Sequence, residues 1–134
     1  MERYGVLAGR ILLALIFVMS GLSKIPGWDQ TAAYMASEGM PMVPLFLAGA
    51  IVFEVLGGLS VMAGFYARVG AAALIIFLIP ATLIFHDFWT LNDPQQQQIQ
   101  MIMFMKNLSI MGGLFLVLAR GAGPLSIDER QGRA

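Results

Sequence analysis

The chain contains no cysteine and only one histidine, His86, among its 134 residues. The lack of cysteine excludes disulfides, Cys-x-x-Cys redox centres and thiolate metal sites. A single histidine cannot supply a bis-histidine haem or a multi-histidine zinc site. We therefore expect no metal site in the chain, and any redox chemistry would need a bound cofactor or a partner protein.

Charged residues are also scarce. They make up 12% of the chain, whereas 58% of it is hydrophobic; a soluble domain carries about 25% charged residues. This composition is typical of a membrane protein. The eight basic residues are balanced by eight acidic ones. Because no basic surplus exists to neutralise phosphates, we expect no nucleic-acid partner.

The hydrophobic residues fall into four long runs. At about 20 residues per crossing, these runs provide four membrane-spanning helices with short connections. We therefore predict an all-α integral membrane protein, a single domain over residues 1–134 whose four transmembrane helices form an antiparallel bundle. A cleaved signal peptide is an alternative for the first run, but the three later spans favour a helix that stays in the membrane. The predicted spans are residues 5–24, 43–65, 68–88 and 99–119.

Two of the connections carry their own signals. In residues 28–39, apolar side chains recur at helical spacing, and Trp28 and Tyr34 are residue types that anchor at lipid head groups. We expect a short interfacial helix there, with a plain loop as the alternative. Residues 90–98 are a polar loop before the last span, and the Asn-Asp-Pro sequence at 92–94 is a turn or helix-start signal.

The basic residues indicate how the helices are oriented. Six of the eight fall on the side of the two chain termini, whereas Lys24 falls on the opposite side and Lys106 lies within the last span. Positive charge gathers in cytoplasmic loops, so we expect both termini in the cytoplasm. The six are Arg3, Arg10, Arg68, Arg120, Arg130 and Arg133.

Two polar points interrupt the hydrophobic runs. Glu54 lies near the middle of the second span, where an ionised carboxylate facing lipid would cost several kcal/mol. Lys106 lies at similar depth in the last span, beside Asn107. We predict that these three residues form a buried polar core. The core either binds a polar head group such as a quinone carbonyl or relays a proton, or it is an ion pair that only fixes the helix register.

Three more side chains are candidates for the same site. Arg10 and Lys24 share one face of the first span, which we expect to point into the bundle. The alternative is that both extend to opposite membrane surfaces. His86 ends the third span beside aromatic residues. It is either a proton donor or quinone-head ligand, or an ordinary residue of the membrane interface.

Several short motifs follow one another along nearly the whole chain. They are Arg10 with Phe17, Gly21 and Lys24; Met35-Ala36-Ser37 before Gly39; Glu54 with Gly57, Gly58 and Gly64; His86; Lys106-Asn107 with Gly112-Gly113; and the tail 123–128. In this order and spacing they resemble the DoxX family of small four-helix bacterial membrane proteins, in particular its inner-membrane YphA-like branch.

The resemblance implies a multi-pass protein of the bacterial inner membrane. Some DoxX relatives are similar to a subunit of a thiosulfate:quinone oxidoreductase, and others are linked to membrane oxidoreductase complexes that manage oxidative stress. The resemblance thus implies a redox or quinone-linked role, with a bound quinone or lipid as the ligand. The partners it implies are the lipid bilayer and either a second copy of the chain or an oxidoreductase protein. Without cysteine, we expect no direct thiol chemistry by this chain, and we expect it to act as a subunit of an oxidoreductase complex rather than as a catalyst alone.

Two other functions fit the same residues. The first is a structural or assembly subunit that binds a partner membrane protein through its glycine-rich helix faces. The second is a small four-helix transporter that uses the membrane carboxylate, although pairing with a lysine would make Glu54 a poor cation site.

Overall fold

The structure, a computed structural model, describes residues 1–133 and is built of helices over that range. Four of these helices are long and apolar enough to cross a membrane. This confirms the predicted all-α fold with four spans. The long helices are α1 (Glu2–Ser23), α3 (Val43–Ala63), α4 (Ala67–Phe85) and α5 (Pro94–Arg120); the short elements are α2 (Trp28–Ser37), the 3-10 turn η1 (Phe88–Thr90) and α6 (Ile127–Arg130).

The helix that contains the last predicted span begins before that span. Helix α5 starts at Pro94, because the Asp93 carboxylate accepts a hydrogen bond from the Gln95 backbone N–H at 3.2 Å. Proline also fits the first position of a helix. The glutamines at 95–98, which we expected in a loop, therefore form the first turn of a 27-residue helix.

Glycines determine how closely α1 and α3 approach each other. A Cβ atom at Gly58 would lie 2.7 Å from Val18 Cγ2, and one at Gly21 would lie 2.7 Å from Val55 Cγ2. Any larger residue at either position would push the two helices apart. Such close contact is the main source of helix association in a bilayer, because lipid tails are as apolar as the side chains.

Helices α3 and α4 contact each other in a similar way. A Cβ atom at Gly57 would lie 2.9 Å from the Leu74 side chain, and Gly70 of α4 lies against Ser60 of α3. Apolar side chains fill the space enclosed by α1, α3, α4 and α5. The buried residues of this core are Ala14, Phe17, Val61, Ala67, Ala71, Leu74, Ile75, Leu78, Leu114, Val117 and Ala122.

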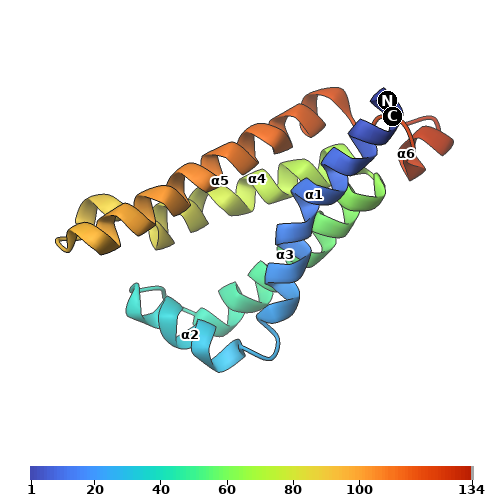
Figure 1. Ribbon diagram of the computed structural model, residues 1–134. Helices are drawn as coiled ribbons and strands as arrows, with labels where there is room; N and C mark the ends of the chain where they lie inside the picture. Colours follow the sequence, from blue (N-terminus) through green and yellow to red (C-terminus); the bar gives the residue numbers. More distant parts are fainter. Residues whose placement is uncertain (134) are drawn as a thin grey trace.

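The four long helices form two pairs, α1 with α3 and α4 with α5, and the packing of α3 on α4 joins the pairs (Figure 1). The pairs meet near α6 and the chain termini, and they diverge toward the opposite end, where α2 lies (Figure 1). Both ends of the chain lie at the same end of the bundle (Figure 1), as an even number of membrane crossings requires.

The C-terminal segment ties the helices together at the end where they meet. Arg10 of α1 is only 3% exposed. Its guanidinium donates hydrogen bonds to the carbonyls of Leu125 at 2.7 Å, Pro124 at 3.2 Å and Met62 at 3.3 Å. One buried cation thus joins α1 to the end of α3 and to the chain after α5.

Asp128 of α6 caps the start of α4. Its carboxylate accepts hydrogen bonds from the backbone N–H groups of Tyr66 at 2.7 Å and Ala67 at 2.9 Å, and it pairs with Arg133 Nε at 2.9 Å. Burial by itself would raise the pKa of Asp128, but the two backbone donors and the Arg133 guanidinium together lower it below the usual aspartate value. Asp128 is therefore held as a carboxylate at neutral pH.

Candidate functional site

An open cavity lies between the two helix pairs, at the end where they diverge. Its volume is about 960 Å³, which is within the range of about 300–1,000 Å³ found for small-molecule sites. Residues from α1 through α5 line it, and most of them are apolar. The lining includes five of the six candidate residues from the sequence, namely Lys24, Glu54, His86, Lys106 and Asn107.

Glu54 and Lys24 form an ion pair on the α1–α3 side of the cavity. Lys24 Nζ donates to the two carboxylate oxygens of Glu54 at 3.0 and 2.9 Å, and to Ser20 Oγ at 2.7 Å. Glu54 is 4% exposed, and the Lys24 side chain is 21% exposed. The Lys24 ammonium is therefore bound within the chain by both Ser20 and Glu54.

The glycine contact between α1 and α3 positions this pair. Lys24 directly follows the last turn of α1, and its side chain reaches back along that helix to Ser20, four residues earlier. Gly21 lies on the same stretch and packs against the Glu54 Cβ. Because the helices nearly touch there, the short distance from Lys24 to the middle of α3 can be bridged by one side chain.

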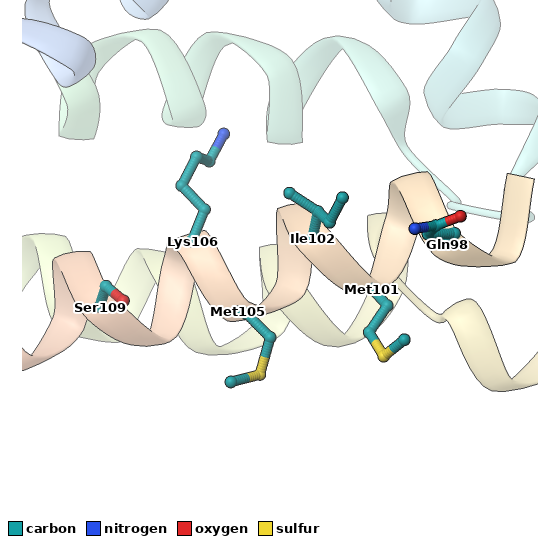
Figure 2. A pocket seen from close by; sticks show the side chains of 6 residues that line it. All are labelled: Gln98, Met101, Ile102, Met105, Lys106 and Ser109. Atoms are coloured by element: carbon teal, nitrogen blue, oxygen red, sulfur yellow. The ribbon is translucent and has the colours of Figure 1, made fainter.

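Lys106 is not the counter-ion of Glu54, contrary to the sequence-based prediction. Its side chain is exposed, and its Nζ lies 3.5 Å from Met103 Sδ on its own helix. Figure 2 shows Lys106 on α5 on the same side as Ile102, with Met101 and Met105 pointing the opposite way. Helix α5 packs mainly on α4, so Lys106 lines the cavity from the side opposite to Lys24.

Arg10 lies outside the cavity. The sequence left open whether it contacts a ligand or extends to the membrane surface. The structure instead buries its guanidinium among backbone carbonyls of residues 62, 124 and 125. Arg10 is therefore a structural residue that joins segments far apart in the sequence.

Asn107 provides an interhelical hydrogen bond. Its side-chain amide donates to Thr82 Oγ1 of α4 at 3.0 Å, and both residues are buried. One N–H and the carbonyl of the Asn107 amide have no partner in this contact. Since Asn107 also lines the cavity, these groups are available to a ligand.

His86 and Tyr34 lie at the rim of the cavity, where α4 ends. His86 Nδ1 lies 2.7 Å from Gln100 Oε1 of α5. The Tyr34 ring of α2 stacks on Phe85, and its hydroxyl donates to the Phe85 carbonyl at 3.4 Å. Partial burial raises the pKa of Tyr34, and the carboxylates of Glu38 and Asp87 raise it further, so the hydroxyl stays protonated as a donor.

Comparisons with known proteins show the family of this chain. The DoxX family's sequence profile matches residues 5–87, which contain the Glu54–Lys24 pair. The chain is 36% identical to the inner membrane protein YphA of Escherichia coli over 125 residues, or 93% of this chain and 89% of YphA. It is also 36% identical to the inner membrane protein YqjF of the same organism over 131 residues, 96% of this chain and 93% of YqjF. The chain belongs to the DoxX family.

As a DoxX protein, the chain is a multi-pass inner-membrane protein with four spans. A longer eukaryotic protein, the ER-derived vesicles protein ERV29 of Saccharomyces cerevisiae, is 29% identical over 128 residues, but the match covers only 34% of ERV29. No solved structure matches the DoxX chain significantly.

The sequence did not predict three residues that contribute to the site around the cavity. Ser20 binds the Lys24 ammonium, Thr82 binds Asn107, and Tyr34 closes the rim near α4. The spacing of four residues between Ser20 and Lys24 places them on one helix face and could have identified the first of these contacts. Nothing in the sequence indicates that Tyr34 reaches the end of the third span.

Proposed function

We propose that the cavity holds a small hydrophobic molecule with a polar head group, and that this ligand serves redox chemistry of the quinone type. The observation that supports this best is the combination of a cavity of about 960 Å³ with mostly apolar walls and a few convergent polar groups, which is the usual composition of a ligand site. Quinones have this combination of an apolar chain and a ring with two carbonyl oxygens.

The hydrogen bonds within the site indicate which side chains can bind the polar head group of the ligand. The charge of Lys24 is already matched within the chain, because its ammonium binds Glu54 and Ser20. The remaining N–H of Asn107 is a donor for a ring carbonyl, and the unused lone pairs of the Glu54 carboxylate are acceptors for a hydroxyl. We expect the chain to bind the ligand and to leave electron transfer to a partner oxidoreductase, since it has no cysteine.

Mass spectrometry of organic extracts tests this proposal. Wild-type protein purified in mild detergent is compared with three variants. Glu54→Gln changes the ion pair, Ala50→Phe adds bulk to the cavity wall one helical turn before Glu54, and Glu2→Gln is a control outside the cavity. We expect a quinone-type molecule in the wild type and the control and its loss in Ala50→Phe and Glu54→Gln. A well-folded wild type that carries only bulk lipid, at the same level in all variants, would refute the proposal.

An assembly role is the second candidate. The exposed face of α5 carries Gly112, around which no other side chain lies within 4 Å of a Cβ position, so a partner helix could approach closely there. Co-purification of a membrane protein that is lost in Gly112→Leu, together with the absence of any small molecule, would favour this role. A cation transporter is disfavoured, because Lys24 already neutralises Glu54.

We further propose that both termini face the cytoplasm. The charge asymmetry of the loops supports this orientation, and the termini lie together at the end opposite α2 (Figure 1). The chain has no native cysteine, so a single cysteine at exposed Ser37 or Gln131 can be probed in intact cells with a membrane-impermeant maleimide. We expect Ser37→Cys to react and Gln131→Cys to be protected; the reverse pattern would invert the topology.

A further inference from the structure

Lys106 is an ammonium near the middle of a spanning helix, and it has no salt bridge among residues 1–133. It lies seven residues after Ile99, the first residue of the expected span, or about 10 Å along the helix at 1.5 Å per residue. A four-carbon stem does not span that distance along the helix to reach water at the start of the span. The weak thioether acceptor of Met103 does not balance its charge.

Glu54 has the carboxylate closest to Lys106 in membrane depth, and it is already paired with Lys24. Both Glu54 oxygens accept from Lys24, so the α1–α3 side of the cavity is a matched pair. Glu38 is the other acidic residue in the lining, and it is the exposed residue that ends α2. The cavity therefore has one unmatched positive charge at membrane depth, on its α5 side.

The position of Lys106 also connects the cavity with the outer surface of α5. Lys106 lines the cavity, and it lines an open depression of about 450 Å³ along α5, together with Gln98, Ile102 and Ser109 (Figure 2). A molecule that enters from the bilayer along α5 would thus meet this ammonium first, with apolar side chains of the cavity beyond it.

We propose that the cavity selects an amphiphile with an anionic head group, which Lys106 binds as the counter-ion that the chain itself does not provide. The apolar part of the molecule lies against the cavity walls. This inference deepens the proposed function and rests on it, because it names the charge of the head group.

Amphiphiles of equal chain length test the role of charge. Dodecanoate, dodecyl phosphate, neutral dodecanol and cationic dodecyltrimethylammonium are titrated into purified protein in a non-ionic detergent, and bound ligand is counted by native mass spectrometry. We expect each of the two anions to bind with an affinity at least about tenfold higher than that of dodecanol. A preference for the carboxylate would identify a fatty-acid-like ligand, and a preference for the phosphate would identify a phospholipid-like one.

Variants of two basic residues on α5 assign the effect to Lys106. Lys106→Gln should lower anion affinity about tenfold or more, and Lys106→Arg should retain it. Arg120→Gln, which removes a positive charge at the exposed end of the same helix, should change little. Circular dichroism and thermal unfolding verify that each variant is folded.

Two outcomes would overturn the inference while leaving the cavity as a ligand site. One is equal binding of dodecanol and dodecanoate to the wild type. The other is an equal loss of anion affinity in Lys106→Gln and Arg120→Gln, which would indicate a general charge effect. If no amphiphile binds and the wild-type extract contains no small molecule, the proposed function fails as well.

Discussion

The ion pair between Lys24 and Glu54 gives the sharpest quantitative prediction. Lys24→Met keeps the length of the side chain and leaves the Glu54 carboxylate, which is 4% exposed, without its two hydrogen bonds. Removing one partner of a buried ion pair typically costs about 3–5 kcal/mol. Because the Lys24 side chain is 21% exposed, we expect the lower end of that range, about 3 kcal/mol.

A double-mutant cycle isolates the interaction itself. Glu54→Gln removes the charge and keeps the shape, so the double variant Lys24→Met/Glu54→Gln has no unpaired buried charge. We therefore expect the double variant to lose less stability than the sum of the losses in the two single variants. The difference, which is the coupling free energy, should be about 1.5–3 kcal/mol. Equilibrium unfolding by guanidinium chloride in micelles of a non-ionic detergent, followed by circular dichroism, measures these free energies.

A second cycle with Lys106→Met serves as the control. Lys106 lies on the opposite side of the cavity and does not bond to Glu54, so its coupling with Glu54 should be no more than about 0.5 kcal/mol. A stronger coupling of Glu54 with Lys106 than with Lys24 would refute the assignment of the ion pair and restore the sequence-based prediction.

Two further predictions concern helix contact and capping. Gly58→Ala should destabilise the protein by about 1–3 kcal/mol, because its Cβ would meet Val18 at 2.7 Å, whereas Gly112→Ala, with open space around it, should be neutral or slightly stabilising in the same unfolding assay; equal effects would contradict the glycine contact. Asp128→Asn should cost about 1 kcal/mol at neutral pH. Since the pKa of Asp128 is lowered in the folded state, its contribution is complete above the usual aspartate pKa of about 4 and is lost as the pH falls through the lower folded value. The difference in melting temperature between wild type and Asp128→Asn should therefore shrink on acidification, and a difference that is constant with pH would exclude this role.

The architecture also explains how a small membrane protein can contain a sizeable cavity. The two helix pairs are joined tightly at the end near the termini, through Arg10 and Asp128. At the other end, the two pairs diverge (Figure 1). Rigid closure at one end thus permits an opening at the other without loss of the bundle.

The sequence by itself determined the four spans and the residues that needed explanation. Length and hydropathy are local properties, so the helices lie where the apolar runs are, and the polar start of α5 differed only because capping by Asp93 extended the helix. The need for a partner for Glu54 was also evident, because an ionised carboxylate in a bilayer is costly wherever it lies.

Only the tertiary structure decided which residue is that partner. The sequence indicates how deep along its helix a residue lies, and it places Lys106 and Glu54 at a similar depth. It does not fix which helices are neighbours, since that depends on close contacts such as Gly21 against Val55, which bring α1 rather than α5 to Glu54. For the same reason the cavity and the unpaired Lys106 on its far side follow from how the helix pairs pack, and no local pattern in the sequence encodes them.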